Sequence, residues 1–172
     1  MAEFLLASKL GDAVNWVISS AGTQADDGRR MHPHAASVLQ ARGFDPSQFR
    51  SRRLTSALVR SADLVLTAEA AHRSATIGLS PQAIGRTFTI REFARLISPQ
   101  VAADATRPYL NAASAGHSLI AAAIANRSRF QPVVPPGDDL ADPIKGRLRA
   151  FRRCARTTDD LLTQIAQRLH LH

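Results

Sequence analysis

The chain has 172 residues and a formal net charge of +8, and 45% of its residues are hydrophobic. That length favours one domain over residues 1–172. The longest apolar run is well short of the roughly 20 residues that span a bilayer, so we expect no membrane partner. The single cysteine, Cys154, excludes an internal disulfide and a zinc site built from several cysteines, and it is typical of a reducing cytoplasm, which is the location we expect.

The first residues are predicted to lie inside a helix. Phe4, Leu5 and Leu10 recur at helical spacing, and Gly11 supplies a stop. No Ser, Thr, Asp or Asn stands before the helix to satisfy its free N–H groups, and the amino group of Met1 would lie at the positive end of the helix dipole. A strand-to-helix turn with free N–H groups binds phosphate in many α/β proteins, and we expect any such turn to lie just before Met1.

Apolar runs and turn residues predict the remaining elements in chain order. They are a strand over 14–20, a helix over 34–42 opened by Pro33 and closed by Gly43, a short helix over 54–59, a strand over 62–67, a helix over 69–75, a strand over 86–90, helices over 92–97 and 110–129, a loop over 132–142, and a helix from 147 onward.

This alternation predicts the α/β class, with a short parallel sheet between layers of helices. The strand over 62–67 is a nearly continuous apolar run, as expected of a strand covered on both faces. Three strands are few for such a chain, since four or five are usual. The last helix is predicted to pack through one apolar stripe, formed by Leu148, Phe151, Ala155, Leu162, Ile165 and Leu169.

The positive charge comes almost entirely from arginine, because Lys9 and Lys145 are the only lysines. A nucleic-acid partner would favour basic residues interleaved with stacking aromatics. The chain has one Trp, one Tyr and seven Phe, mostly at core-like spacing. We therefore expect a solvated arginine-rich surface rather than nucleic-acid binding. The arginines after position 145 could instead attract phosphate-bearing partners.

Several short segments, in their order and spacing, resemble one family. They are Met1–Glu3, Asn15–Gly22, His32–Ala35, Ser51–Thr55, Ala62–Leu66, Phe88–Phe93 and Ala141–Ile144. Together they are similar to the low-molecular-weight protein tyrosine phosphatases over nearly the whole chain, and Phe88–Phe93 resembles an actinobacterial subgroup. The resemblance implies a single phosphatase domain of three layers. It also implies that the chain is truncated at its N-terminus, lacking the central first strand and the phosphate loop that would precede Met1.

The resemblance implies phosphomonoester hydrolysis through a cysteinyl-phosphate, without a cofactor. The family's phosphate loop has the form Cys, five residues, Arg, Ser, Pro, and its arginine grips two phosphate oxygens. Cys154 does not match it, because Asp160 stands where the arginine would be; we interpret Cys154 as a helix residue that partly faces the core. The chain as written is therefore expected to be inactive. Either its start codon is misassigned, or the gene is shortened and encodes a pseudophosphatase that binds or regulates.

The family match implies three site residues. Asp142 corresponds to the general acid of the family's Asp-Pro loop, although Asp before Pro is also a common turn. Ser20 corresponds to a residue that supports the phosphate loop, or it is simply bonded to backbone at the end of a strand. Arg52 corresponds to a basic residue near that loop, with a surface charge as the alternative.

The implied substrate is a phosphorylated protein or a small phosphomonoester. Ile144 and Lys145 stand where the family often has an aromatic that stacks on the substrate ring, so a preference for phosphotyrosine does not follow. His32 and His34 are two positions apart, as are His170 and His172, and neither pair has a third ligand at a recognisable spacing. We therefore predict no metal site. The oligomeric state is left open.

Overall fold

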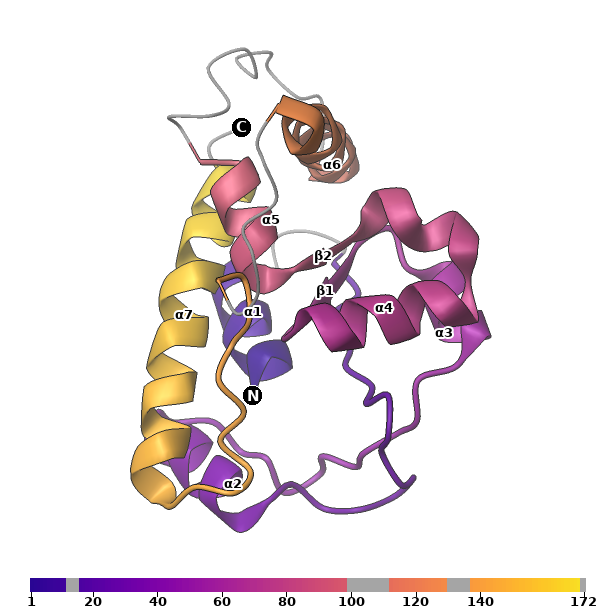
Figure 1. Ribbon diagram of the computed structural model, residues 1–172. Helices are drawn as coiled ribbons and strands as arrows, with labels where there is room; N and C mark the ends of the chain where they lie inside the picture. The colour runs from indigo at the N-terminus through magenta and orange to yellow at the C-terminus, as the bar shows by residue number, and fades with distance from the viewer. Residues whose placement is uncertain (12–15, 99–111, 130–136, 171–172) are drawn as a thin grey trace.

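The structure is a computed structural model that describes residues 1–11, 16–98, 112–129 and 137–170. Short strands near the middle of the molecule are surrounded by helices (Figure 1). In chain order the elements are α1 Ala2–Leu10, α2 Pro33–Gln40, α3 Ser56–Ser61, β1 Val65–Thr67, α4 Ala70–Leu79, the 3₁₀ helix η1 Pro81–Arg86, β2 Thr87–Thr89, α5 Ile90–Leu96, α6 Ala112–Arg129 and α7 Leu148–His170.

The two strands pair in parallel, with Leu66 of β1 opposite Phe88 of β2. Parallel neighbours need a long crossover, and α4 with η1 supplies it. Helices α1 and α7 lie on one side of the strands, and α3 and α4 lie on the other (Figure 1). The predicted class, α/β with a short parallel sheet flanked by helices, is confirmed.

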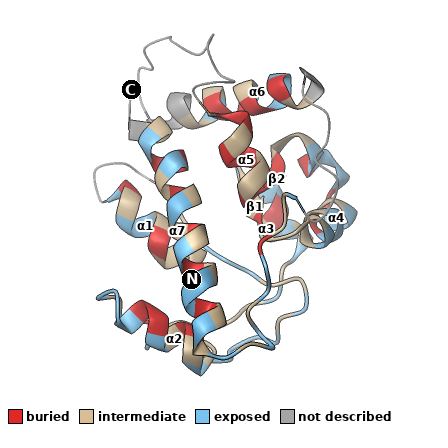
Figure 2. Cartoon of the chain, turned by 60° about the vertical axis from the view of Figure 1, so that its left-hand side comes forward, coloured by how far each residue is buried: buried red, intermediate tan, exposed pale blue. Residues whose placement is uncertain are grey.

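The main core lies where β2 and α5 meet α7. Phe88, Phe93, Leu162 and Ile165 are almost completely buried there, and the buried faces of the helices turn inward (Figure 2). The stripe predicted on α7 is confirmed, because its four central members are buried and Leu148 and Leu169 pack at its ends. Periodic apolar residues thus fix how α7 covers the sheet.

A second cluster and a pair of ion pairs join α1 and α2 to α7. Ala35 and Val38 of α2 pack against Phe151 of α7. Asp159 of α7 binds both Lys9, at 2.7 Å, and Arg42, at 3.1 Å. The N-terminal part of the molecule is therefore held to the same long helix that supports the core.

The strand predicted over residues 14–20 is wrong in its described part. Residues 16–20 have no regular secondary structure, and the side chain of Val17 is 97% exposed. A strand forms only where a neighbour exchanges backbone hydrogen bonds with it, and an apolar sequence alone does not supply one. Residues 12–15 lie outside the described residues. A single parallel bridge between Gly22 and Arg53 follows this segment.

Other boundaries differ by a few residues. Both strands are shorter than predicted, α4 continues to Leu79, and η1 was not predicted. Helix α5 starts at Ile90 because Thr89 and Glu92 form a capping box, in which the Thr89 hydroxyl accepts from the Glu92 N–H at 3.1 Å. That box ends β2 abruptly. Within the described ranges, no helix has the length and apolar character needed to cross a membrane.

Candidate functional site

A hollow of about 160 Å³ lies beside the loop that carries Asp142. Arg91 of α5 forms one wall, and Arg153 and Cys154 of α7 form another. Leu140 and the segment 141–143 complete the lining. Three separate parts of the chain thus line the hollow, and together they contribute Asp142, Cys154 and two arginines.

Two of the three aspartates in this loop hold the loop in place. Asp138 binds Arg95 of α5 at 2.8 Å. Asp139 accepts a hydrogen bond of 2.7 Å from the N–H of Ala70, in the first turn of α4. Leu140, which lies between Asp139 and Asp142 in the sequence, donates its N–H to the carbonyl of Ala68 at 2.9 Å. These contacts tie the loop to the end of β1, to α4 and to α5.

The third aspartate, Asp142, is left open to solvent at the edge of the hollow. Its Oδ1 accepts a 3.0 Å hydrogen bond from the N–H of Ile144, which forms a tight turn around Pro143. The side chain of Ile144 is 52% exposed. Unlike Asp138, Asp142 has no ion-pair partner in the described part of the chain.

Cys154 is half-buried, as the sequence predicted. Burial raises the pKa of its thiol, and a hydrogen bond with Thr158 opposes that shift only in part. The thiol is therefore protonated and neutral near pH 7. Both the carboxylate of Asp142 and the amino group of Met1 are close enough to interact electrostatically with it. The start of α1 therefore lies near the hollow, and burial lowers the pKa of the Met1 amino group.

Ser20 and Arg52 lie together, beside the first turn of α1. The Nε of Arg52 donates to the carbonyl of Ser20 at 2.8 Å, and the hydroxyl of Ser20 donates to Glu3 at 2.5 Å. No hydrogen bond or ion pair joins either residue to Asp142 within the described ranges. The predicted site residues thus form two groups, Asp142 in one and Ser20 with Arg52 in the other.

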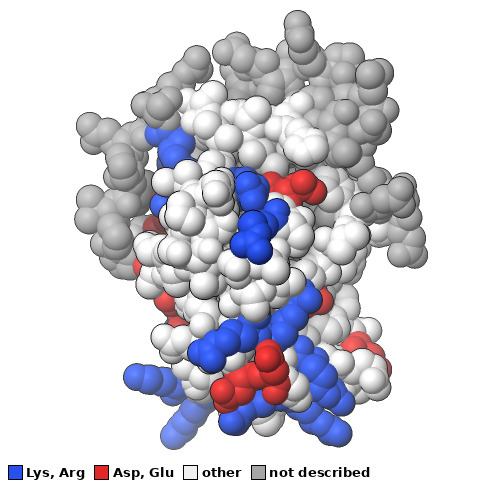
Figure 3. All heavy atoms as spheres, turned by 90° about the vertical axis from the view of Figure 1, so that its right-hand side faces the viewer, with Lys and Arg blue, Asp and Glu red and all other residues white. Residues whose placement is uncertain are grey.

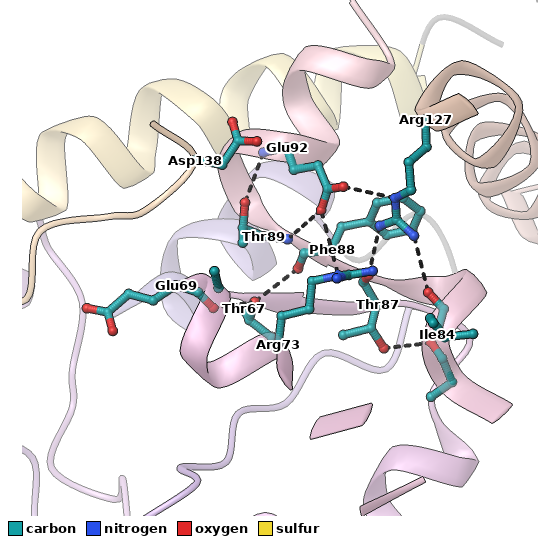
Figure 4. Close-up of polar contacts among 12 residues, drawn as sticks. Thr67, Glu69, Arg73, Ile84, Thr87, Phe88, Thr89, Glu92, Arg127 and Asp138 are labelled. Carbon is teal, nitrogen blue, oxygen red and sulfur yellow. Dashed lines mark hydrogen bonds and ion pairs between the residues drawn. The ribbon is translucent and has the colours of Figure 1, made fainter. Parts of the chain in front are cut away.

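A network that the sequence did not indicate surrounds Glu92 (Figure 4). Its carboxylate binds the Nε of Arg127 at 2.9 Å and faces that of Arg73 at 3.9 Å. Both arginines also donate to the carbonyl of Thr87, at 2.9 and 3.0 Å. Arg127 further covers the ring of Phe88, 4.0 Å from its centroid. The network joins α4, β2, α5 and α6, and no spacing in the sequence connects these residues.

The two histidines of α2 and its cap pack against an aromatic ring. The ring of His32 stacks on Phe151 with 4.7 Å between centroids, and His34 meets the same ring edge-on at 5.4 Å. Across the described residues, no three His, Cys, Asp or Glu side chains converge to hold a metal ion. His170 and His172 fall outside what the structure describes of side chains.

Acidic and basic side chains are mixed on the face drawn in Figure 3. The ion pair of Arg29 with Asp26, at 2.7 Å, also joins two largely exposed side chains. Exposed pairs of this kind contribute little to stability. This mixture is typical of the solvated surface that the composition predicted.

The sequence model of the low molecular weight phosphotyrosine protein phosphatases matches residues 1–130. Two curated relatives, each named a probable low molecular weight protein-tyrosine-phosphatase EpsP, from Ralstonia nicotianae and Ralstonia solanacearum, are 33% identical over 92 residues. That stretch is 54% of this chain and 61% of each relative. The chain thus spans less than two thirds of these relatives, and Asp142 lies beyond the residues that the family model matches.

Solved structures share the fold. The YwlE arginine phosphatase from Geobacillus stearothermophilus superposes with a TM-score of 0.68 at 22% identity, over 99% of this chain and 83% of that one. The tyrosine phosphatase Wzb from Escherichia coli K30, in complex with sulphate, gives 0.67 at 20% identity, over 98% and 87% of the two chains. At these identities the likeness concerns the fold alone.

Proposed function

Because the chain belongs to the low molecular weight phosphotyrosine protein phosphatase family, we propose that it provides the general acid and the supporting framework for hydrolysis of a phosphomonoester. In the proposed reaction a cysteine thiolate attacks phosphorus while Asp142 protonates the leaving oxygen. Asp142 then activates the water that releases phosphate from the cysteine. The substrate is a phosphorylated protein or a small phosphomonoester.

The observation that carries the proposal is the separation of Asp142 from its neighbours. Asp138 and Asp139 are engaged in fixing the loop, whereas Asp142 stays exposed beside the hollow and near the start of α1. A general acid must reach the leaving oxygen, and carboxylates that bind Arg95 or the N–H of Ala70 are not free to do so. The arrangement therefore favours Asp142 over the other two.

Ser20 and Arg52 are proposed as supporting residues. Their mutual hydrogen bond and the contact of Ser20 with Glu3 place them beside the first turn of α1. In the family's arrangement that turn follows the phosphate loop. Arg52 would add positive charge near a bound phosphate, and Ser20 would hold the loop in position.

The 172 residues hold no counterpart of the nucleophilic cysteine or of the phosphate-binding arginine, because Cys154 is followed six positions later by Asp160. We therefore expect this polypeptide on its own to show no phosphatase activity. The same observation favours the second candidate, a binding or regulatory module with the phosphatase fold. The single cysteine is compatible with a cytoplasmic location for either.

The test adds the family's phosphate loop to the chain. An apolar strand followed by Cys, five residues, Arg, Ser, Pro is fused before Met1, and hydrolysis of p-nitrophenyl phosphate is measured with and without the fusion. We expect turnover from the fused protein only, and Asp142→Ala should lower its kcat by about 10²–10⁴-fold. Asp160→Ala, an exposed aspartate on α7, is the matched control and should change kcat little.

A folded fusion that remains inactive, or that keeps its kcat after Asp142→Ala, would refute the catalytic proposal. Turnover by the purified 172-residue polypeptide would refute the expected inactivity. The binding-module alternative requires that this polypeptide be soluble and unfold cooperatively; an aggregated product would count against it.

A further inference from the structure

The outer side of α7 carries a row of exposed arginines, which we call the arginine stripe: Arg149, Arg152, Arg153 and Arg156. Their spacing of three and four residues places them on one side of the helix, opposite the apolar residues that pack on the core. Figure 2 shows exposed residues along this outer side of α7. None of the four forms an ion pair within the described part of the chain.

Acidic residues near the stripe leave its charge uncompensated. No Asp or Glu occurs between residues 143 and 158. The next one, Asp159, binds Lys9 and Arg42. Neither Asp142 nor Asp160 forms an ion pair with the stripe among the described residues. This surface of α7 therefore differs from the face in Figure 3, where both signs of charge are mixed.

Such a row of like charges is unfavourable for the helix itself. Like charges three or four residues apart repel each other on a helix surface. The stripe also lies in the first turns of α7, where the helix dipole disfavours cations and where no acidic residue balances it. The buried side of α7 holds the helix to the core, so the fold does not need these arginines. An anionic partner would relieve both sources of repulsion.

The surroundings of the stripe narrow the choice of partner. A membrane surface would require exposed apolar side chains beside the basic ones, and none of the exposed large hydrophobic residues that the structure describes lies on α7. A single-stranded nucleic acid would require exposed aromatic rings for its bases, and the phenyl ring of Phe151 is only 2% exposed. Carboxylates need neither, and the guanidinium fork binds both oxygens of a carboxylate at once.

The length of the stripe fits a short peptide. At 1.5 Å of rise per residue, the step from Arg149 to Arg156 covers about 10 Å of the helix axis. An extended peptide advances about 3.3 Å per residue, so about four residues cover the same length. Several successive acidic residues could therefore contact the stripe together.

We propose that the arginine stripe docks an acidic segment of a partner protein, a short run of Asp and Glu residues whose carboxylates bind the four guanidinium groups. This inference goes beyond the proposed reaction, because none of the four arginines takes part in it and docking needs no nucleophilic cysteine. It also predicts that binding depends on where the positive charges stand and not only on their number.

The test measures fluorescence anisotropy of a labelled oligoglutamate of about six residues, long enough to cover the stripe, as the 172-residue protein is added at low ionic strength. We expect saturable binding, and none of an oligoglutamine of the same length. Replacing all four stripe arginines by Gln should weaken binding by about tenfold or more, since each exposed pair contributes about 0.2–1 kcal/mol. The matched control replaces four exposed arginines outside α7 by Gln, so that the net charge falls equally, and it should change the affinity less than about twofold. These are Arg29, Arg30, Arg53 and Arg60.

A second measurement separates docking from folding. The stripe variant should unfold at the same temperature as the parent or higher, because it loses repulsive pairs along the helix. The proposal is overturned if oligoglutamate shows no saturable binding, or if the control variant loses as much affinity as the stripe variant. It is also overturned if single-stranded DNA of equal charge, or vesicles of phosphatidylserine and phosphatidylcholine, bind the stripe more tightly than oligoglutamate. None of these results depends on turnover, so the proposed reaction is tested separately.

Discussion

Two clusters of charged residues border α5 and use their charges differently. Around Glu92, every charged group finds a partner: Arg127 and Arg73 bind the carboxylate and the Thr87 carbonyl, and Arg127 also covers Phe88. Around the hollow, Arg91 has an unpartnered buried nitrogen and Asp142 has no ion pair in the described residues.

This difference in pairing separates charged residues that stabilise the fold from those that are left free of ion pairs. A satisfied network stabilises one arrangement of helices and strands, and a ligand would have to displace existing bonds to use it. The Glu92 network therefore belongs to the fold, whereas Arg91 and Asp142 form no ion pair with the described residues.

The largest effect should come from Glu92→Ala. This change removes the common partner of Arg73 and Arg127 and leaves two guanidinium groups facing each other. The side chain of Glu92 is 15% exposed, so we expect the free energy of unfolding in urea to fall by about 2–3 kcal/mol. Glu69→Ala is the control, because Glu69 has only a 3.8 Å contact with His72, and it should lose about 0.5 kcal/mol or less. If both variants lost the same free energy of unfolding, the Glu92 network would contribute no more to stability than an exposed contact.

An intermediate effect should distinguish Asp139 from Asp142. Asp139→Ala leaves the N–H of Ala70 at the start of α4 unsatisfied, and the loss of a helix cap lowers stability by about 1 kcal/mol. Asp142→Ala removes only an exposed turn contact, so stability should change by about 0.5 kcal/mol or less. Thermal and urea unfolding would measure both. If Asp142→Ala proved the more damaging, the division of roles within the loop would be wrong.

The smallest effect concerns the thiol in the hollow. Because burial raises the pKa of Cys154, iodoacetamide should alkylate it more slowly in the folded protein at pH 8 than in urea. A raised folded-state pKa contributes stability that is complete below the unfolded pKa of about 8.5 and is lost as pH rises through the folded value. Stability of the parent should therefore decline faster above pH 9 than that of Cys154→Ala. Equal alkylation rates in buffer and urea would contradict this.

Local patterns predicted much of the fold. The apolar stripe on α7 and the stop at Gly11 depend on neighbouring residues, and they are found as predicted. Helix α2 ends at Gln40, before the predicted stop at Gly43. The sequence also contained the Thr89-Ile-Arg-Glu92 signature, which would have placed the start of α5 correctly. The strand over 14–20 failed because pairing depends on a neighbour in space, which an apolar run does not reveal.

The candidate site divides in the same way. Asp142, Ser20 and Arg52 were proposed from short segments of sequence, whereas the hydrogen bonds of Ser20 with Arg52 and Glu3 appear only in the structure. The hollow could not be predicted, because Arg91 and Arg153 are far apart in sequence and only the packing of α5 against α7 brings them to one space.

The bond from Ala70 to Asp139 also bears on the order of folding. It joins residues 69 positions apart, and closing so long a loop takes time and conformational entropy that local helices do not require. During synthesis β1, α4 and β2 can form early, but the loop has nothing to fasten it until residues 138–140 have left the ribosome. The hollow then takes shape only when α7 docks. Because α7 supplies one wall of the hollow, a nascent chain stalled before α7 would lack it.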